Sequence, residues 1–307
     1  MSPIKGIILK LCSVVLFITM VSLIKATAKH VPVGEAVFFR SFFAIPVILG
    51  WVIARGELRS ALKVKSKLGH FWRGFVGSLA MGMSFAGLGL LPLPEVTAIG
   101  YAAPLLTVIF AAMFLDEKVG VFRISAVALG LIGVLIVISP RLSVFGGETI
   151  ESTQALGVVL VLMGAVCAAL AQIYIRKLVQ FEQTAAIVFY FSITSATLSL
   201  LTLPFGWVMP TVTEFSLLVL AGVLGGAGQI FLTSAYRFAD ASVVAPFDYA
   251  SMIFALLIGF FIFDEVPTGT MLLGAAIVVL AGCIIIWRER QLGLKRGRAR
   301  AVKTPQG

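Results

Sequence analysis

An acidic side chain within an apolar run is the first feature of this sequence that could carry chemistry. The run from 241 to 265 reads ASVVAPFDYASMIFALLIGFFIFDE and holds Asp248 and Tyr249 between apolar residues. A carboxylate at the depth of a membrane core is costly, so it predicts a group that binds substrate or exchanges a proton. The alternative is a structural carboxylate that pairs with Arg237 or Arg40, or that accepts hydrogen bonds from neighbouring hydroxyls.

A related run lies 148 residues earlier in the chain. Residues 95–117 read EVTAIGYAAPLLTVIFAAMFLDE, and in this register Tyr101 falls on Tyr249. Both runs contain a proline and end in Asp-Glu, which predicts an internal repeat. The two tyrosines could then face each other across a central cavity and bind a flat ring. The alternative is a pair of core tyrosines that are bonded to the backbone.

Three further polar side chains within apolar runs are candidates for substrate contact. Arg40 lies near the start of the second apolar run and predicts a cation that meets a polar or anionic substrate. Alternatively, it pairs with Glu35 or extends to the membrane interface. Gln172 and Tyr236 are weaker candidates, because polar side chains within membrane helices often join one helix to another.

The elements that position these residues follow from the composition. The chain has 307 residues, of which 60% are hydrophobic and 12% are charged. Soluble domains carry about 25% charged residues, so the composition predicts a protein that crosses the membrane several times. The three cysteines lie in apolar runs without paired spacing, and there are only two histidines. We therefore expect no disulfide, metal site or cofactor.

Ten apolar runs approach the roughly 20 residues that a membrane span requires. Prolines and glycines separate them, and no connection is long enough for a soluble domain. The predicted spans are 5–28, 34–54, 72–91, 95–115, 121–139, 155–175, 185–206, 214–236, 241–263 and 268–287. The first run also resembles a secretory signal, because Ala26-Thr27-Ala28 looks like a cleavage site. An uncleaved span is preferred, since cleavage would break the repeat.

The positive charges predict the orientation of the chain. If both termini are cytoplasmic, twenty of the 24 Lys and Arg residues lie on the cytoplasmic side, as expected for an inner-membrane protein. Lys25, near the outer end of the first span, is expected to extend to the interface. Topology thus accounts for most of the net charge of +10. The basic cytoplasmic tail, 291–307, is predicted to contact anionic lipid rather than nucleic acid.

Five spans in each half is an odd number, so the second half must be inserted upside down. The predicted fold class is an all-α membrane protein with ten transmembrane helices as two inverted five-helix repeats, 1–140 and 150–290. Small residues at helical spacing in the third and eighth spans predict close helix packing. They are Gly74, Ser78, Gly82, Gly222, Gly225, Gly226 and Gly228. Inverted repeats are typical of alternating-access transporters, which bind substrate near the midplane between the halves.

Several segments, in their order along the chain, resemble a known family. They are Phe38-Phe39-Arg40-Ser41-Phe42-Phe43-Ala44, Leu91-Pro92-Leu93-Pro94-Glu95-Val96-Thr97-Ala98, Pro104, Phe114-Leu115-Asp116-Glu117 and Phe263-Asp264-Glu265. Together they resemble the drug/metabolite transporter superfamily in its EamA-type branch of ten-helix carriers, from about residue 5 to 290. One departure is Pro246, which is not in register with Pro104. We interpret the two Asp-Glu pairs as boundary charges with structural roles.

The resemblance implies secondary transport of a small organic metabolite by alternating access. Within this branch the chain is most similar to bacterial riboflavin transporters, which implies riboflavin uptake across the inner membrane. Carriers of amino acids or S-adenosylmethionine are alternatives within the branch. A membrane enzyme or a non-transporting scaffold is the alternative outside it. The sequence contains no HExxH motif and no phosphate-binding loop, which argues against an enzyme and against ATP-driven transport.

Overall fold

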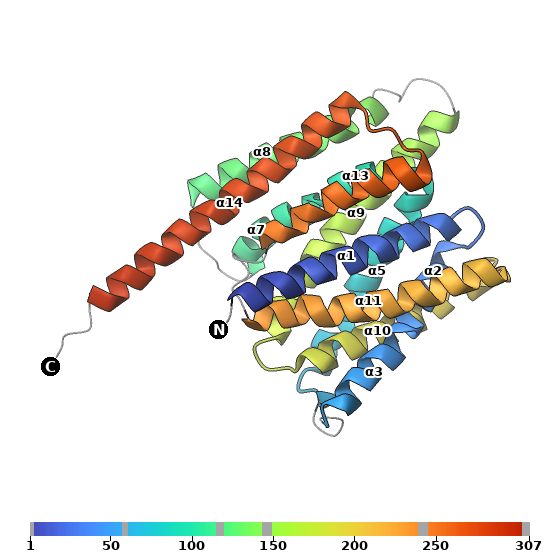
Figure 1. Ribbon diagram of the computed structural model, residues 1–307, viewed down its shortest axis with the longest axis horizontal. Helices are drawn as coiled ribbons and strands as arrows, with labels where there is room; N and C mark the ends of the chain where they lie inside the picture. Colours follow the sequence, from blue (N-terminus) through green and yellow to red (C-terminus); the bar gives the residue numbers. More distant parts are fainter. Residues whose placement is uncertain (1–2, 57–60, 115–119, 143–148, 239–244, 303–307) are drawn as a thin grey trace.

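The computed structural model describes residues 3–56, 61–114, 120–142, 149–238 and 245–302, and every regular element in these ranges is helical. Most of the long helices run roughly along one direction, side by side (Figure 1). The α-helices of the first half are α1 (Pro3–Thr27), α2 (Val33–Phe42), α3 (Ala44–Ala54), α5 (Lys67–Leu90), α6 (Leu93–Gly100), α7 (Ala102–Phe114) and α8 (Val121–Leu142). Those of the second half are α9 (Thr149–Leu178), α10 (Thr184–Leu200), α11 (Val212–Phe238), α13 (Ala250–Phe263) and α14 (Gly269–Val302), with 3₁₀ helices η1 (Leu203–Phe205) and η2 (Ala245–Tyr249).

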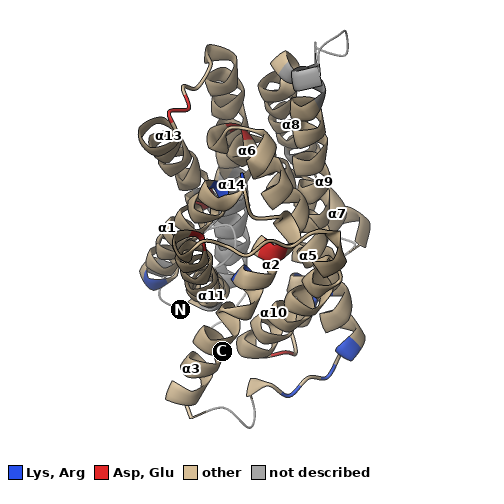
Figure 2. Cartoon of the chain, turned by 90° about the vertical axis from the view of Figure 1, so that its right-hand side faces the viewer, with Lys and Arg blue, Asp and Glu red and all other residues tan. Residues whose placement is uncertain are grey.

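The helices have the length and composition of membrane spans. Five segments are long and apolar enough to cross a membrane, and they are Ile4–Thr27, Val33–Ala54, Leu93–Phe114, Thr153–Leu178 and Val212–Ala235. Four shorter segments are also apolar, and they are Ile124–Pro140, Thr184–Leu200, Phe247–Phe263 and Gly269–Ile285. With α5 these segments make up the ten predicted spans. Figure 2 shows few charged residues along the helices.

Helix packing follows the inverted repeat. In the predicted repeat, α1 corresponds to α9 and α5 corresponds to α11. The structure packs α1 along α11 and α5 along α9. Each of these contacts is therefore the repeat equivalent of the other. The fifth and last spans, α8 and α14, pack against each other. In addition, α1 begins and α14 ends at the same end of the bundle (Figure 1). The fold is therefore an all-α membrane protein built from two inverted five-helix repeats.

Two predicted spans are broken near their middle by proline. Proline has no N–H to donate to the carbonyl four residues earlier. Pro46 therefore leaves the Phe42 carbonyl without its helical donor, and α2 gives way to α3 at Phe43. Pro104 has the same effect on Gly100, and α6 gives way to α7 at Tyr101.

The equivalent break in the second repeat is at Tyr249, where η2 gives way to α13. Tyr249 has φ −67° and ψ −15°, and Tyr101 has φ −67° and ψ −6°. The predicted repeat register therefore places two residues of the same type and backbone conformation at equivalent breaks.

Several of the small residues allow the close packing that the sequence predicts. A Cβ atom at Gly222 would lie 2.9 Å from the Phe39 carbonyl oxygen, and one at Gly226 would lie 3.1 Å from the Ala44 Cα. A Cβ at Gly74 would lie 2.7 Å from Thr194. The prediction is wrong for Gly82, where a Cβ would have no atom within 4 Å.

The closest backbone approach described between α8 and α14 yields a stability prediction. A Cβ atom at Gly274 would lie 2.6 Å from the Gly133 carbonyl oxygen and 2.8 Å from the Val137 amide nitrogen. Backbone atoms cannot rotate away, so Gly274→Ala must push the two helices apart. We expect the free energy of unfolding to fall by about 1–3 kcal/mol. Denaturation in mixed micelles would measure it, with Gly269→Ala as the control, because that Cβ has no atom within 4 Å. An unchanged stability would contradict the packing.

Candidate functional site

The two tyrosines of the repeat lie in contact. The ring centroids of Tyr101 and Tyr249 are 5.0 Å apart and the ring planes meet at 67°, an edge-to-face arrangement. Both side chains are buried, at 6% and 8% exposure. The Tyr101 hydroxyl is 2.7 Å from the Ser251 Oγ, which in turn donates to the Asp248 carbonyl oxygen at 2.7 Å. The two helix breaks are therefore joined by a ring contact and a short hydrogen-bonded chain.

Asp248 forms an ion pair beside these rings. Its Oδ1 lies 2.6 Å from the Lys10 Nζ of α1. Lys10 is 2% exposed, whereas the Asp248 side chain is 43% exposed. Of the two expected partners, Arg40 is wrong, because Asp248 pairs with Lys10 instead. The side chain of the other, Arg237, lies outside the described part of the structure. The pair ties α1 to the break at Tyr249 and leaves part of the carboxylate accessible.

Arg40 is buried on α2, and both structural alternatives for it are wrong. It is 2% exposed, so it does not extend to the interface. Glu35 does not pair with it but accepts a hydrogen bond from the Val208 N–H at 3.1 Å. Arg40 instead lies over the Phe191 ring, with its Cζ 5.4 Å from the centroid. Arg73 of α5 approaches the same ring at 3.6 Å and is 4% exposed.

A helix-capping residue near Arg73 indicates that this arginine lies within a helix. The predicted third span begins at residue 72, whereas α5 begins at Lys67 and buries Arg73 in its second turn. The Ser66 Oγ accepts a hydrogen bond from the Gly69 N–H at 3.2 Å and caps the helix. Serine at this position is a standard mark of a helix start.

No described contact joins the remaining two candidates to the tyrosines and Asp248 or to the arginines at Phe191. Gln172 is partly buried on α9, and no hydrogen bond joins its amide to the described residues. Tyr236 lies on α11, but its side chain is outside the described part of the structure.

A second ion pair joins several helix ends at the other end of α1. The Lys25 Nζ lies 2.7 Å from the Glu265 Oε1, and it donates to the carbonyl oxygens of Leu91 at 2.8 Å and Leu88 at 3.3 Å. The Glu265 Oε2 accepts a hydrogen bond from the Leu93 N–H at 2.8 Å. Lys25 is largely buried, so the prediction that it extends to the interface is wrong. The contacts of Glu265 agree with the structural role that we expected for it; Asp116 and Glu117 lie outside the described residues.

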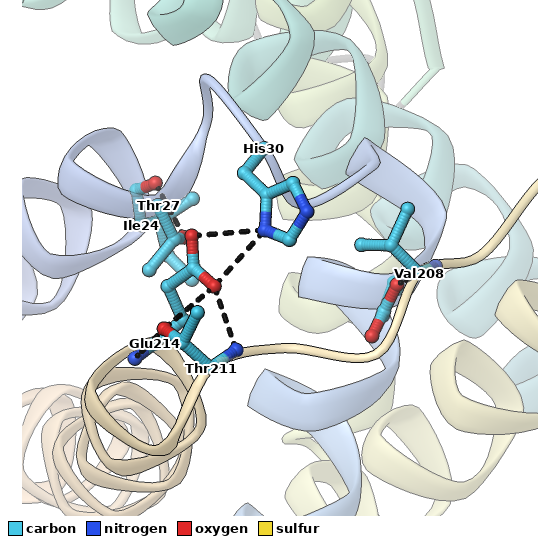
Figure 3. A network of polar contacts seen from close by, with 7 residues as sticks. Ile24, Thr27, His30, Val208, Thr211 and Glu214 are labelled. Carbon is cyan, nitrogen blue, oxygen red and sulfur yellow. Dashed lines mark hydrogen bonds and ion pairs between the residues drawn. The ribbon is translucent and has the colours of Figure 1, made fainter.

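A histidine and a glutamate close the same end of the bundle (Figure 3). His30, which follows α1, places its Nδ1 3.0 Å from the Glu214 Oε2. Glu214 also accepts hydrogen bonds from the Thr211 N–H at 2.8 Å and the Thr211 hydroxyl at 2.9 Å. The Thr211 hydroxyl is 3.3 Å from the Glu214 N–H, which makes these two residues a capping box at the start of α11.

The Lys25–Glu265 pair yields a second stability prediction. Both side chains are mostly buried, so Glu265→Gln removes a charge that solvent replaces poorly. We expect the free energy of unfolding to fall by about 1–3 kcal/mol, less than the roughly 3–5 kcal/mol for a fully buried pair, because both side chains keep some exposure. Lys25→Met in the Glu265→Gln background should cost less than Lys25→Met alone, and the difference is the coupling energy. Asp264→Asn is the control, because Asp264 is exposed. Strict additivity would contradict the pairing.

A small cavity lies at this end of the bundle. Its volume is about 110 Å³, and it is lined by Pro92, Pro94, Glu95, Glu265, Val266, Pro267, Thr268 and Met271. Sites for small organic ligands typically enclose about 300–1,000 Å³. This cavity is therefore too small for a metabolite. In the described part of the chain, no group of three or more His, Cys, Asp and Glu side chains is placed to hold a metal ion.

Comparisons with known proteins agree with the repeat and the fold. Residues 4–139 and 144–288 match the EamA-like transporter family. An S-adenosylmethionine uptake transporter of Rickettsia felis is 30% identical over 257 residues, which cover 84% of each chain. A pseudopaline exporter of Pseudomonas aeruginosa is 29% identical over 290 residues, 93% of this chain and 97% of the exporter. A crystal structure with a TM-score of 0.68 and 20% identity covers 94% of this chain and 98% of its own.

Proposed function

Because the chain belongs to the EamA-like transporter family, we propose that it is a secondary transporter whose substrate is S-adenosylmethionine or a closely similar charged metabolite. The observation that carries this proposal is the meeting of two helix breaks at Tyr101 and Tyr249, beside the partly exposed Asp248 carboxylate. In transporters with inverted repeats, discontinuous helices form the substrate site near the midplane.

The chemistry of the site fits a cationic aromatic compound. S-adenosylmethionine carries an adenine ring, a sulfonium cation and an amino acid group. Tyrosine rings stack on purines and attract cations through their faces. The Asp248 carboxylate supplies a negative charge next to those rings. Two relatives that align with 84% of this chain, at 29% and 30% identity, are S-adenosylmethionine uptake transporters. This similarity supports uptake of the same compound here.

Riboflavin, the substrate implied by the sequence resemblance, remains a prediction. It is flat and neutral, so the tyrosine pair suits it. The buried charges of Lys10, Arg40 and Arg73, together with the partly exposed Asp248 carboxylate, favour a charged substrate instead. Riboflavin therefore belongs in the test as a competitor, together with amino acids.

Uptake into proteoliposomes tests the proposal. Labelled S-adenosylmethionine should accumulate in vesicles that contain the protein, and unlabelled S-adenosylmethionine should compete while riboflavin and methionine do not. Uptake of labelled riboflavin without uptake of S-adenosylmethionine would favour the substrate that the sequence resemblance implies. Mass spectrometry of the recovered compound should show it unchanged, since we propose transport without chemical conversion. If labelled S-adenosylmethionine, riboflavin and methionine, each tested in turn, all fail to enter, with protein of verified fold, the proposal is refuted.

The orientation and domain limits are part of the same proposal. We place both termini in the cytoplasm and the two repeats at 1–140 and 150–290, and we assign the tail from 291 to contact with anionic lipid. The backbone of α14 is helical to Val302, so this tail continues the last span. Reporter fusions at each terminus would test the orientation, and opposite locations of the two would contradict it.

A further inference from the structure

Two arginines from different helices lie against one phenylalanine ring inside the bundle. The guanidinium carbons of Arg73 on α5 and Arg40 on α2 are 3.6 and 5.4 Å from the Phe191 ring centroid. Both arginines are at least 96% buried. We refer to Arg40 and Arg73 as the arginine pair. Arginine does not lose its proton in proteins, so the pair holds two positive charges in an apolar interior.

No carboxylate in the described part of the structure forms an ion pair with these charges. The Nε and Nη1 atoms of both residues are buried and have no hydrogen-bond partner among the described residues. Glu182 accepts the backbone N–H groups of Lys65 and Ser66 at 2.7 and 2.9 Å instead. The contact with Phe191 offsets only part of the cost of burying two cations. The pair therefore reduces the stability of the fold, and an intramembrane charge of this kind indicates a function.

The surrounding helices are built to admit the guanidinium groups. A Cβ atom at Gly77 would lie 2.8 Å from the Arg73 Nη1 and 2.9 Å from the Phe191 ring. One at Gly225 would lie 2.9 Å from the Arg40 Nε and 3.0 Å from the Met20 sulfur. The space that the pair occupies thus depends on glycine at two positions, on α5 and on α11.

The distance between the arginine pair and the tyrosines is comparable with the length of a metabolite. Met20, which borders Gly225 together with Arg40, is ten residues along α1 from Lys10, the partner of Asp248. Ten residues of α-helix span about 15 Å. This is roughly the length of an extended metabolite with a ring at one end and an amino acid group at the other.

We infer that the arginine pair binds the carboxylate group of the transported metabolite, while its ring and cation lie at Tyr101, Tyr249 and Asp248. Guanidinium groups present parallel N–H donors that match the two oxygens of a carboxylate. The bound carboxylate would supply the negative charge that the described residues do not. This inference rests on the proposed function, because it assumes that the substrate is carried between the repeats.

Two ligands that differ only in the carboxylate test the inference. Binding of S-adenosylmethionine and of decarboxylated S-adenosylmethionine to the purified full chain in nanodiscs can be measured by calorimetry. Arg40→Gln and Arg73→Gln should each weaken binding of the first ligand about 10- to 100-fold and leave the second within about twofold. Arg55→Gln is the control, because Arg55 is exposed and lies over Trp51. An equal loss for both ligands, or no loss for either, would overturn the inference.

Thermal unfolding without substrate separates binding from a structural role. Removing a buried charge that lacks a partner should leave the unfolding midpoint of Arg40→Gln and Arg73→Gln unchanged or raise it. A lower midpoint in both variants would assign the arginines to the fold and contradict the inference.

Simple anions separate this inference from the identity of the substrate. Acetate should raise the midpoint of the wild type and not that of the Arg40→Gln/Arg73→Gln variant. If acetate stabilises a wild type that does not bind S-adenosylmethionine, the substrate proposal fails and the anion site stands. Stabilisation by inorganic phosphate and not by acetate, or by neither, would overturn the assignment to a carboxylate.

Discussion

Asp248→Asn is expected to reduce substrate uptake by at least about 10-fold. The variant removes the carboxylate that we propose meets the cationic part of the substrate, and it takes from the buried Lys10 an ion-pair partner at 2.6 Å. Breaking a fully buried pair costs about 3–5 kcal/mol. Since the Asp248 side chain is 43% exposed, solvent screens part of the interaction and we expect a stability loss of about 1–3 kcal/mol. Uptake into proteoliposomes and denaturation in mixed micelles measure the two effects.

A second variant separates the two roles of Asp248. Lys10→Met/Asp248→Asn removes both charges, so much of the stability lost in Asp248→Asn should return. Uptake should remain low if the carboxylate contacts the substrate. Asp264→Asn is the matched control, because Asp264 is exposed and lies at the end of α13. Recovery of uptake in the double variant would show that Asp248 serves only to pair with Lys10.

Gly282→Ala is expected to cause the second large loss of uptake, again about 10-fold or more. The added Cβ atom would overlap the Tyr249 hydroxyl and the end of its ring. Tyr249 is in contact with Tyr101 at a centroid distance of 5.0 Å, so the ring cannot move away without disturbing the tyrosine pair. Overpacking of this kind costs about 1–3 kcal/mol. Uptake and the unfolding midpoint, measured on the same preparation, distinguish a displaced site from an unfolded protein.

Relief of the overlap provides the control for this variant. Tyr249→Phe removes the hydroxyl and keeps the ring, and Gly282→Ala/Tyr249→Phe should therefore recover part of the lost uptake. Tyr249→Phe alone should transport at close to the wild-type rate if the ring face is what the substrate meets. Normal uptake by Gly282→Ala would show that the contact between the two tyrosines is not needed for transport.

The sequence predicted those features that depend on local composition and on repeated residues along the chain. Apolar runs gave the ten spans, and the 148-residue repeat placed Tyr101 and Tyr249 at equivalent positions. The breaks at Phe43 and Tyr101 lie three residues before Pro46 and Pro104, because each proline lacks the N–H that the helix needs. We did not predict these breaks, although the prolines that cause them were visible.

The ion pairs could not be predicted in the same way. Lys10 and Asp248 are 238 residues apart, and their contact depends on how α1 packs beside η2. From the sequence, only arginines are expected as ion-pair partners of Asp248, and Lys25 is expected at the membrane interface. The structure instead buries Lys10 and Arg73 and covers most of Lys25. In a polytopic bundle, the depth of a basic residue depends on where its helix begins and on which neighbours cover it.

The contacts of Lys25 have a consequence for the motion that alternating access would require. One ammonium group joins α1, the carboxyl end of α5 and Glu265, and Glu265 also holds the first turn of α6. Withdrawal of α1 therefore separates Lys25 from Glu265 and from the carboxyl end of α5 in the same event. Opening at this end therefore breaks the ion pair and both carbonyl hydrogen bonds of Lys25 together, whereas the hydrogen bond between Glu265 and Leu93 does not depend on α1.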